Sequence, residues 1–129
     1  MNWQYVELEE VYQIHSAIIK TAKTRASVRD FTLLHSAVER PKATYEGEDL
    51  YPTVFTKAAA LLQSICWNHP FSDGNKRTAW LSTKRFLFLN SYSLNPKSKE
   101  AIDFMAYTDN QKPEFKEIVA WLKSHSKKI

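Results

Sequence analysis

The sequence predicts a single all-α domain, a compact bundle of about six helices with one short extended insert. Apolar residues recur at helical spacing through most of the 129 residues. Only two glycines occur, which argues against sandwiches and barrels with many tight turns. The length favours one domain over residues 1–129 with a modest hydrophobic core.

The composition indicates a soluble globular protein. Hydrophobic residues make up 43% of the chain and charged residues 25%, which is ordinary for a globular domain. The single cysteine, Cys66, excludes an internal disulfide and suits a reducing compartment. No apolar run is long enough to span a bilayer, and the acidic start is unlike a signal peptide, so we expect a cytoplasmic location.

The net charge of +4 does not by itself indicate a nucleic-acid binder. Lysines and arginines are spread along the chain in small clusters, whereas nucleic-acid binding predicts a denser basic stripe interleaved with exposed aromatic residues. Local positive charge is sufficient for a small phosphate-bearing ligand. A helical nucleic-acid binder that represses its own operon is kept as an alternative, and its affinity would fall steeply with salt.

Six segments carry the apolar spacing of helices. They cover about residues 7–24, 28–39, 53–67, 76–90, 98–108 and 113–125. Glutamates open the first segment and lysines close it, in the order that suits the helix dipole. Pro41 ends the second segment and Pro113 opens the sixth. The predicted inward-facing residues are Val11, Ile14 and Ile18; Phe31, Leu34 and Val38; Val54, Ala58, Leu61, Leu62 and Ile65; and Phe115, Ile118, Val119 and Leu122.

The segment 76–90 differs from the other five because it is apolar on almost all sides. A helix of this kind is expected in the middle of a bundle. Four tryptophans are distributed along the chain, and we interpret them as packing anchors: Trp3, Trp67, Trp80 and Trp121.

An irregular insert separates the second and third predicted helices. Pro41 and Pro52 bracket it, and Glu46-Gly47 offers a turn between two short extended arms. The pattern predicts a flap or short hairpin at about residues 41–52, although a plain surface loop is equally compatible with it. An extended arm of this kind can pair with a strand of a partner.

The segment His69–Arg77, with the sequence HPFSDGNKR, joins two helices through a turn. Pro70 lacks an amide hydrogen and disfavours helical backbone in the residue before it, so the preceding helix ends just upstream. Gly74 permits strained backbone and the close approach of a ligand. The amides of Gly74, Asn75 and Lys76 then lie at the start of the next helix, which is a favourable position for an anion.

Other side chains of this segment supply groups for phosphate chemistry. Lys76 and Arg77 lie in the first helical turn, where positive charge is unfavourable unless an anion binds. Asp73 offers a hard oxygen ligand for Mg²⁺, and His69 is a suitable proton acceptor for an incoming hydroxyl. Phe71 is expected to point inward and anchor the loop. Together these groups suit phosphoryl or nucleotidyl transfer; in the alternative interpretation His69 only caps a helix and the charges are solvated.

The remaining candidates for metal binding or nucleophilic chemistry are weaker. His15, His35 and His125 have no second ligand at metal spacing, so we expect them on helix surfaces or in the core. Cys66 lies on or beside an apolar stripe and is interpreted as a core residue. A Cys66–His69 nucleophile pair has the right residue types but lacks a third group.

The segment 69–77 resembles the signature of the Fic/Doc family, His-x-Phe-x-Asp/Glu-Gly/Ala-Asn-Gly/Lys-Arg. Similarity to the death-on-curing (Doc) branch of that family covers roughly residues 5–125. The resemblance implies a Fic-like helical fold that uses ATP and Mg²⁺. The similar stretches are Val28-Arg-Asp-Phe-Thr-Leu-Leu, Arg40-Pro, Leu50-Tyr-Pro-Thr, Lys57-Ala-Ala-Ala-Leu-Leu, Asn68-His-Pro-Phe, Arg77-Thr-Ala, Phe86-Leu-Phe-Leu-Asn and Trp121-Leu.

The resemblance also implies roles for the residues of the signature. His69 is the general base that acts on a hydroxyl of a target protein, and Asp73 positions Mg²⁺. The backbone of Asn75 and Lys76, together with Arg77, holds phosphate oxygens. Fic adenylyltransferases carry glycine where this chain has Lys76, and in the Doc branch a lysine there goes with an inverted nucleotide and transfer of the γ-phosphate. We therefore favour protein kinase chemistry over AMP transfer.

The same resemblance implies partners. The target class is translation elongation factor Tu, modified on a threonine so that protein synthesis stops, and the flap is where Fic-type enzymes dock the target. We find no Ser/Thr-x-x-x-Glu-Gly/Asn inhibitory motif. The nearest match is Thr44 with Glu48, but Asp49 follows where the motif has glycine or asparagine. A separate antitoxin is therefore the expected inhibitor, and nucleic acid would be contacted only through it.

Two features depart from the pattern of Doc relatives. The stretch 23–27 lacks the glycines common there. Leu81 stands four residues after Arg77, at a position where the best-known member of the Doc branch has an asparagine. A catalytically silent paralogue that binds nucleotide or antitoxin is therefore kept as a further alternative.

Overall fold

The computed structural model describes residues 2–23 and 27–129, and this part of the chain is built from six α-helices. The predicted all-α class is confirmed. Residues 24–26, which belong to the glycine-poor stretch, lie outside the described residues. None of the described helices is long and apolar enough to cross a membrane. The helices are α1 (Leu8–Ala22), α2 (Phe31–Glu39), α3 (Val54–Asn68), α4 (Asn75–Leu89), α5 (Ser98–Gln111) and α6 (Phe115–Ser124).

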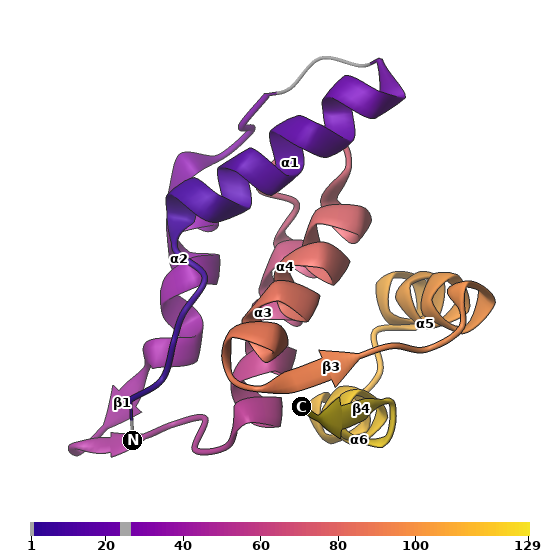
Figure 1. Ribbon diagram of the computed structural model, residues 1–129. Helices are drawn as coiled ribbons and strands as arrows, with labels where there is room; N and C mark the ends of the chain where they lie inside the picture. The colour runs from indigo at the N-terminus through magenta and orange to yellow at the C-terminus, as the bar shows by residue number, and fades with distance from the viewer. Residues whose placement is uncertain (1, 24–26) are drawn as a thin grey trace.

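The helices are arranged around a central pair, α3 and α4 (Figure 1). Helices α1 and α2 lie on one side of this pair, and α5 and α6 lie on the other. The prediction that 76–90 lies in the middle of the bundle is confirmed, because α4 belongs to the central pair. Helix α3 is nevertheless the more deeply buried of the two. Twelve of the fifteen residues of α3 are buried, on nearly all of its sides.

Helix α4 is buried less completely than its apolar sequence suggests. Hydroxyl residues occupy part of its buried face, namely Thr78, Ser82 and Thr83, and some of its apolar residues lie on its other faces. Phe88 points into solvent and is 58% exposed. Phe31, which was predicted to face inward, is also exposed, at 62%, because α2 starts only at that residue and its first turn projects from the bundle.

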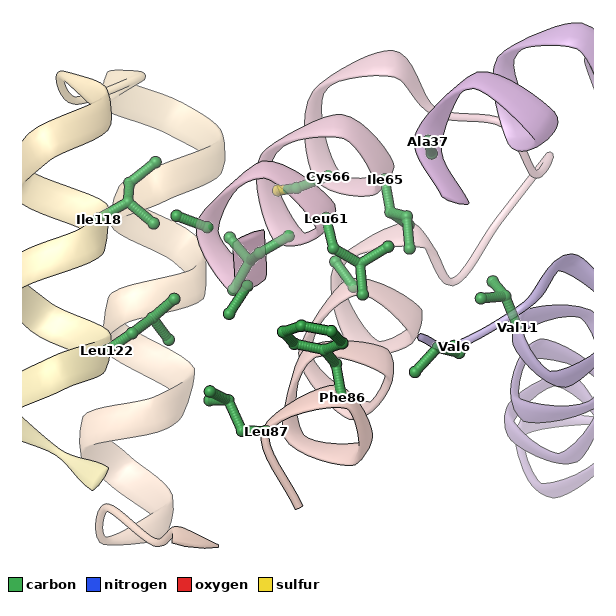
Figure 2. Packing of buried hydrophobic residues seen from close by; sticks show 14 of the residues in the cluster. Val6, Val11, Ala37, Leu61, Ile65, Cys66, Phe86, Leu87, Ile118 and Leu122 are labelled. Atoms are coloured by element: carbon green, nitrogen blue, oxygen red, sulfur yellow. The ribbon is translucent and has the colours of Figure 1, made fainter. Parts of the chain in front are cut away.

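The hydrophobic core runs through the whole bundle without a break (Figure 2). Side chains from α3 and α4 fill the centre, and α6 closes one side. The N-terminal segment and the start of α1 close the other side. The core residues labelled in Figure 2 are Val6, Val11, Ala37, Leu61, Ile65, Cys66, Phe86, Leu87, Ile118 and Leu122.

The insert before α3 contains the predicted hairpin. Strands β1 (Thr44–Tyr45) and β2 (Glu48–Asp49) are antiparallel. Glu46 and Gly47 close them with positive φ angles of 51° and 82°, as expected for a tight two-residue turn. The insert is not extended throughout, because a 3₁₀ turn, η1 (Arg40–Lys42), opens it.

Arg40 closes the base of the insert. Its Nε donates to the hydroxyl of Tyr51 at 2.8 Å, so the residues that begin and end the insert are bonded to each other. Its Nη1 donates to Gln63 Oε1 at 2.6 Å and to Ser64 Oγ at 3.0 Å, both on α3. The insert therefore has a fixed attachment to the central helix.

Lys57 on α3 forms the second attachment. Its side chain is fully buried, and the ammonium donates to Asp49 Oδ2 of β2 at 3.2 Å and to the carbonyl of Pro41 at 3.1 Å. The ammonium also lies 5.3 Å from the ring centroid of Trp3 and 5.8 Å from that of Tyr5. Cation–π contact and two hydrogen bonds thus replace the water that a buried lysine loses.

A second strand pair lies near the C-terminus and was not predicted. Strands β3 (Tyr92–Leu94) and β4 (Ser126–Lys128) are antiparallel, with Leu94 opposite Ser126. Helix α6 accordingly ends at Ser124. Each strand is too short to produce a periodic signal, and the partners are far apart in the sequence.

The burial of Lys57 leads to a prediction about stability. We expect Lys57→Ala to lower the free energy of unfolding by about 3 kcal/mol, because it leaves a cavity and removes the partner of Asp49. Lys57→Met fills the same space, and the half-exposed Asp49 can be solvated, so its cost should stay within about 1 kcal/mol. Urea unfolding of both variants measures the difference. Equal losses in the two would show that the charge rather than the packed volume is responsible.

Candidate functional site

The segment 69–77 forms the connection between α3 and α4, as predicted. Helix α3 ends at Asn68, and His69 follows it in the left-handed region with φ 48°. Gly74 precedes α4 with φ 77°. The structure thus brings all the predicted site residues onto one short turn and the first turn of α4. His69, Asp73, Lys76 and Arg77 are exposed, whereas Asn75 is buried.

The side chain of Asn75 holds the turn together from inside. Its Oδ1 accepts the backbone N–H of Phe71 at 3.0 Å, and its Nδ2 donates to the carbonyl of Phe71 at 2.9 Å. Nδ2 also lies 3.5 Å from Nδ1 of His69. Phe71 is 1% exposed, which confirms its predicted inward position. Only the backbone of Asn75 is then free for a ligand, in line with the expectation from sequence.

The connection between α1 and α2 fixes the start of the turn. Arg29 donates through Nε to the carbonyl of His69 at 2.7 Å and through Nη2 to the carbonyl of Asn68 at 2.8 Å. Its backbone amide donates to the carbonyl of Pro70 at 2.8 Å. These bonds satisfy carbonyls that the end of α3 leaves without helical partners. Arg29 lies in one of the stretches that resemble Doc relatives, but the sequence did not predict its contact with the turn.

Helix α1 supports the other half of the turn. His15 is fully buried, its Nε2 lies 2.8 Å from the carbonyl oxygen of Asp73, and its ring stacks on Phe71 with centroids 3.7 Å apart. Burial lowers the pKa of His15, although the hydrogen bond to Asp73 acts in the opposite direction. A neutral imidazole whose Nε2–H donates to that carbonyl fits these surroundings. Of the two positions expected for the histidines, on a helix surface or in the core, His15 takes the second. Its contact with Asp73 was not predicted.

The backbone at Gly74 is held close to α1. A Cβ atom at this position would lie 3.3 Å from Ile19 Cδ1, and the positive φ disfavours any other residue. Gly74 N–H donates to Asp73 Oδ1 at 2.8 Å. The glycine is therefore required both by the backbone conformation and by the tight packing of the turn on α1.

The turn offers backbone N–H groups that suit a phosphate, and a carboxylate that suits a metal ion bound with it. The amides of the first residues of α4, Asn75 and Lys76, have no acceptor within the helix and lie at its positive end. Asp73 supplies an exposed carboxylate beside them. In the described part of the chain, no group of three or more His, Cys, Asp or Glu residues could hold a metal. A cation here would need oxygen ligands from phosphate and water, which is how Mg²⁺ binds with nucleotides.

The two cations of the first turn differ in their surroundings. Lys76 Nζ lies 4.0 Å from Asp109 Oδ2 on α5. This carboxylate offsets part of the positive charge that was predicted to require a bound anion. Among residues 2–23 and 27–129, no carboxylate forms an ion pair with Arg77. The unfavourable charge at the positive end of α4 therefore resides mainly in Arg77.

A groove with a volume of ≈ 530 Å³ begins at Lys76 and Arg77 and continues between α4 and α5. One end carries the two cations and the rest is largely apolar. Such a groove suits a ligand that combines an anionic group with an apolar ring. The other residues that line it are Trp80, Ser98, Ala101, Ile102, Met105 and Ala106.

Cys66 is unsuited to act as a nucleophile. The residue is fully buried, and burial together with the negative charge of Asp109 raises the pKa of its thiol to about 11. A thiol of this kind remains protonated near neutral pH. His35 is exposed on α2, and His125 stacks on Trp121 at 3.9 Å, so neither histidine contributes to the turn.

The two bonds between Asn75 and Phe71 give a testable prediction. Asn75→Ala leaves a buried donor and a buried acceptor without partners, and we expect a loss of about 3 kcal/mol in the free energy of unfolding. Chemical denaturation measures this loss. Asn110→Ala, at an exposed position of α5, is the matched control and should change stability by less than about 0.5 kcal/mol. A similar small change for both variants would contradict the assigned role of Asn75.

The state of Cys66 can be tested with a thiol reagent. At pH 8 we expect alkylation in the folded protein to be more than about 100-fold slower than in urea, because the buried thiol is rarely ionised. The rate is followed by mass spectrometry. Comparable rates in the folded and unfolded protein would show that Cys66 is accessible and ionised.

The chain is similar to proteins of a known family. The model of the Fic/DOC family matches residues 5–87. A relative described as "Toxin Doc" from Mycolicibacterium smegmatis is 55% identical over 67 residues, which is 52% of this chain and 52% of the relative. The aligned part thus spans about half the length of that relative. Because the family match covers more than half of the chain and includes the whole segment 69–77, the chain belongs to the Fic/DOC family.

Proposed function

We propose that this protein is a Doc-type toxin that transfers the γ-phosphoryl group of ATP to a hydroxyl of a target protein. The observation that carries the proposal is the turn at 69–77, which places a histidine, a carboxylate, helix N-terminal amides and two cations on one rigid connection. Membership of the Fic/DOC family and the likeness to Toxin Doc support it.

His69 acts as the general base in this proposal. It is exposed, and its backbone is fixed by the bond from Arg29 Nε to its carbonyl. The side-chain nitrogen Nδ2 of Asn75 lies 3.5 Å from Nδ1 of His69 and restricts the imidazole ring on that side. An imidazole held in this way can accept the proton of an attacking hydroxyl, which typically contributes a factor of ~10²–10⁴ to the rate.

The phosphates of ATP bind at the start of α4. The amides of Asn75 and Lys76 and the guanidinium of Arg77 face the phosphate oxygens, and Asp73 is the residue that would hold Mg²⁺. When bound, Mg²⁺ would neutralise charge on the phosphates. The groove between α4 and α5 has room for the remainder of the nucleotide. In-line transfer then depends on positioning and charge rather than on covalent catalysis.

Lys76 is the reason for preferring phosphoryl over adenylyl transfer. A glycine at this position leaves space for the α- and β-phosphates, whereas lysine fills that space and brings a point charge. Its ammonium lies beside Asp109 at the mouth of the groove, where it can contact a phosphate of an inverted nucleotide. Transfer of AMP is the competing outcome.

The proposal includes two protein partners and a cytoplasmic site of action. The target belongs to the class of translation elongation factor Tu, and modification would block translation. Both strands of the hairpin β1–β2 are exposed, and so are the side chains of Tyr45 on β1 and of Leu50 directly after β2. Such a hairpin suits strand pairing with a target segment. A separate antitoxin inhibits the toxin in trans.

The transferred group is tested with ATP labelled separately at the α and γ positions, incubated with the protein, Mg²⁺ and elongation factor Tu. We expect label on the target from γ-labelled ATP alone. Label from the α position would reverse the assignment to adenylyl transfer. Binding of ATP with Mg²⁺ but transfer of neither label would support a catalytically silent nucleotide-binding paralogue.

The base is tested by His69→Ala. We expect the rate of transfer to fall by at least about 100-fold while the free energy of unfolding stays nearly unchanged, because His69 is exposed and its carbonyl bond to Arg29 is retained. His35→Ala, at an exposed position of α2, is the matched control and should retain the wild-type rate. Persistent activity of His69→Ala would remove His69 from the mechanism.

A further inference from the structure

His15 contacts the turn from a distant part of the chain. It is separated from Asp73 by 58 residues, yet its Nε2 lies 2.8 Å from the carbonyl oxygen of that residue. The ring is fully buried and lies almost parallel to Phe71, with an interplanar angle of 8°. Nothing in the mechanism proposed above uses this side chain.

A packing role alone does not explain a histidine at this position. In the described part of the chain, Nδ1 of His15 is buried without a hydrogen-bond partner. An apolar side chain of similar size would fill the same space without leaving a polar atom unpaired. The histidine is therefore accounted for by what its other nitrogen does, which is to donate to the carbonyl of Asp73.

The contact with Asp73 fixes more than one backbone atom. Asp73 Oδ1 accepts the N–H of Gly74 at 2.8 Å, so the direction of the carboxylate follows from the path of the backbone at these two residues. That path is held on α1 by His15 and by the close approach of Gly74 to Ile19. Arg29 holds the opposite end of the turn, at His69.

We propose that His15 is a positioning residue for the carboxylate of Asp73, and that it sets the affinity of the turn for Mg²⁺ bound with nucleotide. The inference rests on the proposed function in so far as Asp73 is the metal ligand. Groups that orient a metal ligand from behind typically change metal affinity by about 10–100-fold when they are removed. Removing His15 should accordingly affect Mg²⁺ dependence, and leave the rate at saturating Mg²⁺ largely intact.

Two variants separate the hydrogen bond from the stacking. His15→Phe keeps a ring against Phe71 but cannot donate to Asp73. His15→Gln retains an N–H donor but loses the aromatic ring. If the hydrogen bond positions Asp73, the glutamine variant should behave more like the wild type than the phenylalanine variant does. Urea unfolding shows for each variant whether the cooperative fold is kept.

The chain offers an internal readout that needs no activity. It contains only two glycines, Gly47 in the hairpin and Gly74 in the turn, so labelling with ¹⁵N-glycine gives one amide signal from each. In the metal-free protein we expect His15→Phe to shift the Gly74 signal and to leave the Gly47 signal in place. His15→Gln should give a smaller shift of Gly74.

Titration with Mg²⁺ at fixed ATP then measures the proposed consequence. We expect the Mg²⁺ concentration for half-maximal nucleotide binding to rise about tenfold in His15→Phe, and less in His15→Gln. An unchanged Gly74 signal together with an unchanged Mg²⁺ midpoint in His15→Phe would overturn the inference. So would equal losses of stability in both variants with no change in Mg²⁺ midpoint, which is the result of a purely structural role.

The failure of the proposed function gives a different result. A wild-type protein that binds no ATP at any Mg²⁺ concentration would overturn the proposed function, whereas the Gly74 comparison in the metal-free protein would still decide whether His15 positions the turn. If His15→Phe does not fold, His15→Leu, which also cannot donate to Asp73, takes its place. A shifted Gly74 signal with a raised Mg²⁺ midpoint then supports the inference, and an unchanged signal with an unchanged midpoint contradicts it.

Discussion

The connection between α3 and α4 depends on one constraint, which is that two interrupted helices leave backbone groups without helical partners. Arg29 donates to the last carbonyls of α3, and the side chain of Asn75 pairs with both backbone groups of Phe71. His15 donates to the carbonyl of Asp73. Once these groups are paired, the first backbone N–H groups of α4 are the donors that remain free to bind a ligand. The proposed anion site is thus a product of the way in which the turn is folded.

The same turn brings several positive charges close together. The positive end of α4, Lys76 and Arg77 would repel one another without compensation. Asp109, on α5, offsets part of this charge and also lies near the buried thiol of Cys66, at 4.0 Å. Helix α5 therefore contributes both an apolar wall of the groove and the carboxylate nearest to Lys76. It shapes the site although no residue of the signature lies on it.

The fold and the signature could be predicted from the sequence because both are local. Helical spacing, Pro70 and Gly74 determine where helices end and begin, and the structure agrees to within a few residues. His15 and Arg29 could not be found in this way, because they bind backbone carbonyls, which every residue offers and no side-chain pattern marks. The sequence also did not show that α3 is buried more deeply than α4. Part of the buried face of α4 is formed by Thr78 and its hydroxyl neighbours, which give no apolar periodicity.

Helix α3 connects the hairpin insert to the turn, and it is rigid because it is buried along most of its length. The insert is fastened at Lys57, near the start of the helix, while His69 follows its last residue. Eleven helical steps separate Lys57 from Asn68, or about 16 Å along the axis. A target strand paired with the insert would need about five extended residues to cover that distance. The length of α3 would then set the distance between the docked segment and His69. The modified hydroxyl would be selected by its spacing from the docked segment rather than by the residues beside it.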